Sequence, residues 1–127
     1  MEIISTKEAP AAIGPYSQAI VVNNMVFTSG QIPLVPETGE MVKGGIKEQA
    51  DQALKNLKAL LIASGSDLDH VLKTTCFLTD MGDFAAFNEV YAGYFINKPA
   101  RSCIAAAALP KGAMVEIESV AVKISGE

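Results

Sequence analysis

The residue with the clearest chemical potential in this sequence is Arg101, the only arginine among 127 residues. It stands in the stretch Pro99-Ala-Arg-Ser-Cys103, among residues that favour a strand. A guanidinium is always charged, and its planar fork of donors matches a carboxylate or phosphate at two points. Beside residues expected to be buried, Arg101 needs an anion, which is either an internal salt-bridge partner or a bound ligand. The spacing alone leaves both interpretations open.

Two carboxylates, Glu116 and Glu118, lie on the last expected strand. Alternation along a strand places both side chains on the same face of the sheet. Either one could act as a general acid or base, or could position a water molecule. The alternative for each is an ordinary solvated strand residue, and this alternative is favoured for Glu118, although alternation by itself does not decide between the two.

Cysteine and histidine give little support to other chemistries. The two cysteines, Cys76 and Cys103, are far apart and form no CxxC pair, and His70 is the only histidine. No cluster of metal ligands is therefore expected, and the cysteines are expected to be free thiols. A nucleophilic Cys103 would need a base that no motif supplies. His70 is expected in a loop just before a strand.

Composition indicates a single globular domain over residues 1–127. Acidic residues outnumber basic ones by 14 to 10, the net charge is -4, and half of the residues are hydrophobic. An acidic chain without a basic cluster is a poor nucleic-acid binder.

No apolar run reaches the ~18 residues of a membrane span, and no signal-peptide pattern is present, so a cytoplasmic protein is expected. The apolar excess suggests that part of the surface is covered by another subunit.

The hydrophobic pattern predicts alternating strands and helices. The first half is predicted to contain a short strand at 2–5, a loop at 7–15, a hairpin of strands 16–22 and 25–30, and a long loop at 31–45. The second half is predicted to contain a helix at 46–64, a strand at 71–79, a helix from near Asp83 to about Ile96, and strands at 102–107 and 114–124. The order is ββ-α-β-α-ββ with a possible additional N-terminal strand.

Two helices can cover only one face of such a sheet. Yet several strands are apolar at both odd and even positions, for example the last one, in which Val115 and Ile117 alternate with Val120 and Val122. In an antiparallel sheet with one solvent-exposed face, apolar and polar residues alternate more regularly along each strand. The second face is therefore expected to pack against partner subunits.

Several segments together resemble the RidA family, also called YjgF or reactive-intermediate deaminases. They are Ala-Ala-Ile-Gly-Pro-Tyr-Ser-Gln-Ala at 11–19, Ser-Gly-Gln-Ile-Pro at 29–33, Asn-Glu-Val-Tyr at 88–91, Pro-Ala-Arg-Ser-Cys at 99–103 and Val-Glu-Ile-Glu at 115–118. Their order and spacing match nearly end to end. The resemblance is to the enamine/imine deaminase branch of that family.

The resemblance implies a chorismate-mutase-like α+β fold, a mixed sheet with two helices on one face, and a homotrimer with sites between subunits. The implied activity is hydrolysis of 2-iminobutanoate and 2-iminopropanoate, or their enamine tautomers, to 2-oxo acids and ammonia. No metal or organic cofactor is expected.

Four residues are implied to be catalytic. Arg101 would anchor the substrate carboxylate and Glu116 would assist water attack, which favours a ligand over a salt bridge for Arg101. Tyr16, held after Gly14-Pro15, would aim its hydroxyl into the cleft, although an ordinary amphipathic tyrosine is the alternative. Cys103 is included for its backbone carbonyl more than for its sulfur.

Five residues are implied to bind the substrate: Ser29, Gly30, Gln31, Phe84 and Asn88. For the first three, the competing interpretation is a simple turn at the end of a strand. Asn88 could instead cap local backbone, and Phe84 could simply pack in the core. Alternative functions are a regulatory module that binds small carboxylates or, with less support, a ribonuclease or translation inhibitor.

The sequence departs from the family pattern after Cys103. Family members commonly carry a Glu and an Arg where this chain has Ala105 and Ala108. This departure leaves the preferred imino acid open.

Overall fold

The protein is built from six strands and two α-helices, and this computed structural model describes residues 1–124. In chain order the elements are β1 (Glu2–Ile4), β2 (Ala19–Val22), β3 (Met25–Thr28), α1 (Ile46–Ala63), β4 (Val71–Leu78), α2 (Phe84–Tyr94), β5 (Ala100–Ala105) and β6 (Val115–Val122). Short 3-10 turns occupy Leu68–His70, Met81–Asp83 and Pro110–Gly112. The predicted element order, including the additional first strand, is confirmed.

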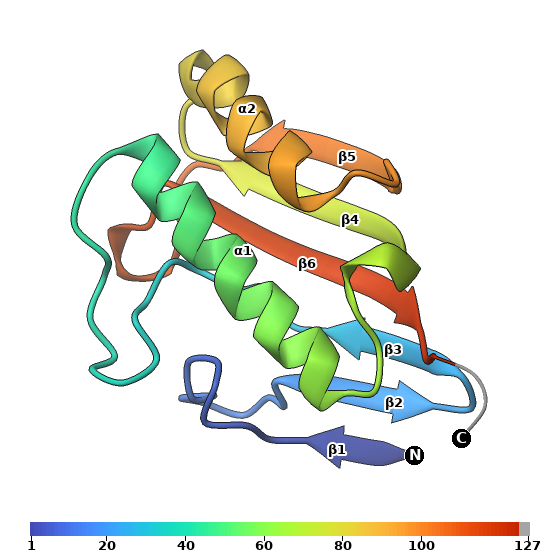
Figure 1. Cartoon of the computed structure of the whole chain (residues 1–127). Coiled ribbons are helices and arrows are strands. Elements are labelled where there is room, and N and C mark those ends of the chain that lie inside the picture. Colours follow the sequence, from blue (N-terminus) through green and yellow to red (C-terminus); the bar gives the residue numbers. More distant parts are fainter. Residues whose placement is uncertain (125–127) are drawn as a thin grey trace.

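The six strands form one mixed sheet in the order β1-β2-β3-β6-β4-β5. Neighbours are antiparallel except for β4 and β5, which run parallel. Parallel neighbours cannot be joined by a hairpin and need a crossover connection, which α2 supplies here. Because of this crossover, α2 lies over the β4–β5 end of the sheet (Figure 1).

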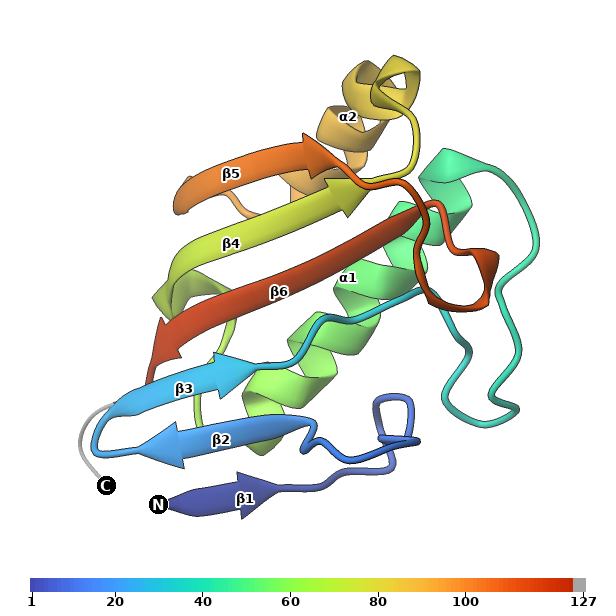
Figure 2. The ribbon, with the colours of Figure 1, turned by 180° about the vertical axis from the view of Figure 1, so that it is seen from behind.

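Both helices cover the same face of the sheet, and the hydrophobic core lies between the two layers (Figures 1 and 2). Helix α1 places its apolar stripe on the sheet at three- and four-residue spacing, with Ala50, Ala53, Leu54, Leu57, Leu60 and Leu61 fully buried. Gly65, with φ of +84°, follows the end of this helix, in the left-handed conformation that glycine adopts without strain. Neither helix in the described part of the chain is long and apolar enough to cross a membrane.

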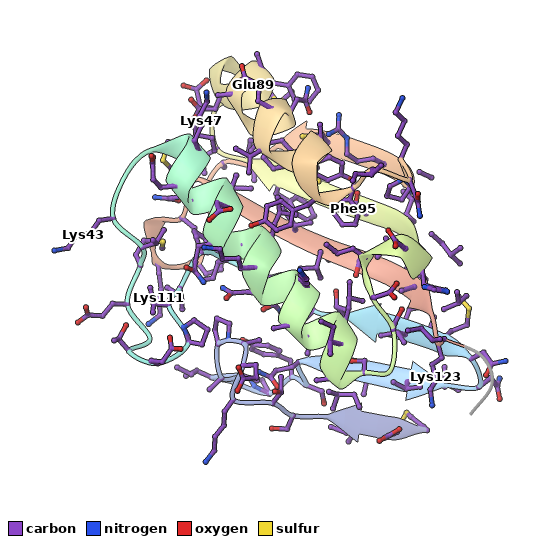
Figure 3. All side chains as sticks on the ribbon, in the orientation of Figure 1. Lys43, Lys47, Glu89, Phe95, Lys111 and Lys123 are labelled. Carbon is purple, nitrogen blue, oxygen red and sulfur yellow. The ribbon has the colours of Figure 1, made fainter. Side chains whose placement is uncertain are left out.

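Polar contacts fix α2 against α1. Lys47 and Glu89 point toward each other with Nζ and Oε1 2.9 Å apart (Figure 3). This pair is exposed and contributes at most ~1 kcal/mol. One to two turns along, the Tyr94 hydroxyl donates to Asp51 Oδ1 over 2.5 Å, and this bond lowers the pKa of Asp51. Both contacts join α2 to α1 rather than to the sheet.

The second face of the sheet carries no helix (Figure 2) and is apolar. Its half-buried and exposed side chains include Ile3, Ile20, Val22, Phe27, Phe77, Ile104, Val120 and Val122. The prediction of strands that are apolar on both faces is therefore confirmed. In a single chain this face lies open to solvent.

Some predicted boundaries were wrong. Strand β5 begins at Ala100 rather than at residue 102, because Ala100 already pairs with Lys73 of β4. Helix α2 ends at Tyr94, two residues before the predicted end, ahead of a turn in which Lys98 has φ of 54°. Asp83 does precede the helix, but its side chain makes no capping hydrogen bond. Arg101 consequently lies inside a strand.

Candidate functional site

Arg101 lies on β5, the edge strand, and is held by side chains of α2. Its Nη1 donates to Asn88 Oδ1 over 2.8 Å. Its Cζ lies 5.4 Å from the centroid of the Phe84 ring and 4.8 Å from that of Tyr91. Among residues 1–124 no carboxylate lies within salt-bridge distance of Arg101. Within these residues the internal salt-bridge interpretation is therefore wrong, and the guanidinium charge is available to a bound anion.

A groove of about 470 Å³ runs beside Arg101, between α2 and the start of β5. Its lining is mostly apolar and comprises Asn88, Tyr91, Ala92, Phe95, Ile96, Lys98, Pro99 and Arg101. Arg101 uses one side-chain donor on Asn88, so its other donors remain free for a ligand. This geometry suits a small carboxylate with an apolar body.

Cys103 shares the helix-covered face with Arg101 and pairs across the strands with Cys76. Partial burial raises the pKa of the Cys103 thiol, and full burial raises that of Cys76 to about 12. Both sulfurs are therefore protonated at neutral pH. This argues against a thiolate nucleophile, and a role for the Cys103 backbone stays a prediction.

Glu116 lies on the open face of β6, directly against Gly30. The bridge between Gln31 and Ile117, with both backbone N–H groups donating across it, brings the loop after β3 alongside β6. A Cβ atom added to Gly30 would lie 1.8 Å from Glu116 Oε2. A larger residue at this position would therefore force the Glu116 side chain to move, whereas glycine leaves its carboxylate in place.

Partial burial raises the pKa of Glu116 above its usual value, and the like charge of Glu118 raises it further. Phe77 pairs with Glu116 across the sheet and supplies apolar surroundings. A carboxylate with a raised pKa is the state that suits a general acid or base. Glu118 is exposed, in agreement with the solvated alternative for that residue.

Tyr16, Gly30 and Gln31 line one small cavity of about 160 Å³. Tyr16 is more than half exposed, and the turn that holds it is closed by a hydrogen bond from its backbone N–H to the Gly14 carbonyl. Lys111 lines the same cavity and was missed by the sequence analysis. Its φ of 58° shows that the turn before β6 aims it in an uncommon direction, which no spacing pattern reveals.

Two predicted ligand residues use their side chains to build the loop. The Ser29 hydroxyl donates to the Ser17 carbonyl over 2.6 Å. The Gln31 amide is buried and donates to the Ser29 carbonyl over 3.2 Å. The turn interpretation therefore accounts for these contacts, and substrate binding by Ser29 and Gln31 stays a prediction.

The candidate residues thus fall into two groups. The arginine group consists of Arg101, Asn88, Phe84 and Cys103, and the glutamate group consists of Glu116, Gly30, Gln31, Ser29 and Tyr16. Arg101 is in register with Thr74, whose side chain is buried under the helices, whereas Glu116 is in register with Phe77 on the open face.

A single chain cannot bring the two groups together. Arg101 and Glu116 lie on opposite faces of the sheet and on strands separated by β4, about 10 Å apart across the sheet. A small imino acid such as 2-iminopropanoate or 2-iminobutanoate cannot contact both from opposite faces of one sheet. If Arg101 and Glu116 act on one molecule, they must come from different copies of the chain.

A sequence profile of the endoribonuclease L-PSP family matches residues 6–123. The chain belongs to this family. It is the family also named RidA or YjgF, so the resemblance inferred from the sequence motifs is confirmed.

Individual relatives cover nearly the whole chain. The 2-iminobutanoate/2-iminopropanoate deaminase of Mus musculus is 52% identical over 123 residues, which are 96% of this chain and 91% of that protein. RidA of an Antarctic Psychrobacter species has a TM-score of 0.92 at 46% identity, covering 96% of this chain and 99% of that one.

Escherichia coli TdcF, solved with bound serine, has a TM-score of 0.93 at 45% identity, covering 98% of this chain and 100% of that one. These likenesses confirm the chorismate-mutase-like α+β fold with two helices on a mixed sheet.

The departures from the RidA pattern lie at the surface of the chain. Ala105 ends β5 and Ala108 follows it, and both are exposed. Neither contacts Arg101 through a side-chain hydrogen bond or ion pair, since alanine offers no such group. The two alanines therefore alter only the exposed surface at this end of β5.

Proposed function

We propose that this protein hydrolyses small 2-imino acids, such as 2-iminobutanoate and 2-iminopropanoate, to 2-oxo acids and ammonia. The observation that carries the proposal is the oriented guanidinium of Arg101, which two rings and an amide hold without a carboxylate partner among residues 1–124. The name of the mouse relative supports the reaction. The serine bound to TdcF, a small amino acid, carries the same carboxylate handle.

The active site is formed between copies of the chain, arranged as a homotrimer. Two observations support this assembly: the open face of the sheet is apolar, and the arginine and glutamate groups lie on opposite faces of one chain. In a closed ring of identical subunits, each interface joins two different surfaces. The arginine group of one subunit then meets the glutamate group of its neighbour at every interface.

The reaction needs a fixed substrate, a directed water and proton transfer. Arg101 binds the carboxylate through two parallel hydrogen bonds, and this fixes the position and orientation of the C=N carbon. Ionised Glu116 accepts a proton from the attacking water as the C–O bond forms. That proton passes to nitrogen and gives an intermediate with a hydroxyl and an amino group on the same carbon. The proton of this new hydroxyl then moves to nitrogen through the Glu116 carboxylate as the C–N bond breaks, so ammonia leaves and the carbonyl forms.

The other predicted residues complete the pocket. Asn88 orients Arg101, Phe84 forms the wall beneath the guanidinium, and Gly30 leaves room for the Glu116 carboxylate. Tyr16 contributes its exposed hydroxyl to polar contacts with the substrate. Ser29 and Gln31 shape the loop around Gly30, and the Cys103 backbone lies beside the carboxylate site.

A coupled assay tests the proposed reaction. Threonine dehydratase generates 2-iminobutanoate from threonine, and formation of 2-oxobutanoate is followed above the spontaneous rate. We expect acceleration in proportion to the protein added. No acceleration by folded protein, combined with measurable binding of 2-oxobutanoate, would replace the enzyme with a carboxylate-binding module.

The endoribonuclease activity in the family's description has less support in this chain. His70, the only histidine, pairs with Asp67 Oδ1 over 2.6 Å in the turn before β4 and belongs to neither group. The net charge of -4 also disfavours binding to RNA phosphates.

Replacement of Gly30 by alanine is expected to reduce the deaminase rate by about 100-fold. The added methyl group would overlap the Glu116 carboxylate, so this carboxylate must rotate away from the water it activates. The measurement is kcat/KM in the coupled assay, with the melting temperature recorded in parallel.

Gly93→Ala is the matched control for Gly30→Ala. Gly93 lies in α2 with no atom within 4 Å of an added Cβ, so alanine should raise helix stability by about 1 kcal/mol and leave activity unchanged. Equal activities of the two variants would show that the space at Gly30 is not needed by Glu116.

Glu118→Gln should shift the pH dependence of the reaction. Glu116 must be ionised to accept a proton, so activity falls as the pH drops through its pKa. Removing the like charge of Glu118 lowers that pKa, and the acid limb of the kcat/KM profile should move to lower pH. An unmoved acid limb would show that another group controls it.

A further inference from the structure

Three residues of α2 form a cradle for Arg101. Phe84, Asn88 and Tyr91 are spaced by four and three residues, so they project from the same face of the helix. Asn88 Oδ1 accepts a hydrogen bond from Nη1 of the guanidinium. The centroids of the Phe84 and Tyr91 rings lie 5.4 and 4.8 Å from Arg101 Cζ. The ring contact at Tyr91 is the shorter of the two.

The position of the Tyr91 side chain is in turn fixed by a residue of β4. Its hydroxyl lies 2.7 Å from Thr74 Oγ1, and Thr74 is completely buried. Thr74 is also the residue directly opposite Arg101 across the parallel strands. Three contacts therefore connect the two ends of Arg101. Its backbone pairs with Thr74, the Thr74 hydroxyl bonds that of Tyr91, and the Tyr91 ring contacts the Arg101 guanidinium.

The Tyr91 ring has little freedom to turn. It packs between Phe87, with ring centroids 5.6 Å apart, and Phe95, with centroids 4.7 Å apart. Burial raises the pKa of Tyr91, so its hydroxyl stays protonated and does not compete with a ligand for the Arg101 charge. The ring thus presents a neutral, immobile surface to the guanidinium.

We propose that Thr74 and Tyr91 are positioning residues that fix the plane of the Arg101 guanidinium for a substrate carboxylate. This inference rests on the proposed function. A two-point contact between guanidinium and carboxylate requires the two planes to align. The Tyr91 ring, over which Arg101 Cζ lies, limits how far that plane can tilt, and the bond to Thr74 fixes the place of the ring.

Two single substitutions and their combination test this role. Thr74→Val leaves the Tyr91 hydroxyl without its partner, and Tyr91→Phe leaves the buried Thr74 hydroxyl with only the weak donor Cys76 Sγ, 3.9 Å away. Both changes should lower stability. The double variant removes both hydroxyls, so much of the lost stability should return. A merely structural role predicts that substrate affinity recovers together with the melting temperature.

For a positioning role we expect a different result. The KM for 2-iminobutanoate should rise by about three- to tenfold in both single variants and should stay raised in the double variant, with kcat changed less than twofold. Tyr94→Phe is the matched control, because it removes another hydroxyl of α2, bonded to Asp51, that does not contact Arg101. That variant should keep the wild-type KM.

Calorimetric titration with 2-oxobutanoate separates this inference from the proposed reaction. The product retains the carboxylate, so its dissociation constant should rise by about three- to tenfold in the same variants, and this measurement does not depend on the imine assay. Wild-type affinity in Tyr91→Phe, recovery of affinity with stability in the double variant, or no binding to the wild type would each overturn the positioning role.

Discussion

Arg101→Ala should lower the deaminase kcat/KM by at least about 100-fold, because the substrate loses both the charge and the orientation of its anchor. Arg101 is half-buried on an edge strand and makes no ion pair within residues 1–124. Its main structural contacts are the two ring stacks, worth about 1 kcal/mol each. The variant should therefore fold and assemble, which gel filtration and circular dichroism can verify.

Arg101→Lys distinguishes the guanidinium fork from its charge. Lysine keeps a positive charge but offers no planar pair of donors, so about a tenfold loss of kcat/KM is expected. Wild-type activity in both Arg101 variants would contradict the anchor role. Wild-type activity in the lysine variant alone would leave the charge, rather than the fork, as the essential feature.

Glu116→Gln should lower kcat by about 100- to 10,000-fold, the range usual for loss of a general base. Glutamine has the same shape but cannot accept a proton from water. Because the raised pKa shows that its site disfavours the ionised form, a neutral amide should leave the melting temperature equal or higher. A folded, fully active Glu116→Gln variant would remove this residue from the mechanism.

Mixing the two inactive variants tests whether the site spans two subunits. In trimers reassembled from equal amounts of Arg101→Ala and Glu116→Gln chains, roughly a quarter of the interfaces would join an intact arginine group to an intact glutamate group. About that fraction of wild-type activity should return. No recovery from verified mixed trimers would mean that each site lies within one chain.

The elements could be predicted from local patterns because those patterns arise from short-range geometry. The three- and four-residue spacing of Leu54, Leu57 and Leu61 identified α1 closely, since a helix repeats every 3.6 residues. Apolar residues at both odd and even positions of β6 correctly indicated that the second face of the sheet is also apolar. Boundaries near Pro99 were less accurate, because pairing of β5 with β4, a non-local contact, sets the start of that strand.

The sequence by itself determined the chemistry available: one guanidinium, two neighbouring carboxylates, and motifs specific enough to identify the family. It also favoured a bound anionic ligand over an internal salt-bridge partner for Arg101 once the resemblance was recognised. Only the tertiary structure decided where these groups lie. The parallel β4–β5 pair forces α2 to cross over Arg101, and this crossover brings in Tyr91, which the 88–91 motif contains but to which the sequence assigned no role in the site.

Sheet register likewise placed Arg101 and Glu116 on opposite faces. Register depends on pairing between strands far apart in the chain, so no local pattern contains it. For the same physical reason the glutamate group was recognisable as a set of residues but could not be assigned to one side of the molecule. The separation of the two groups, and with it the argument for a site shared between subunits, comes from the folded chain alone.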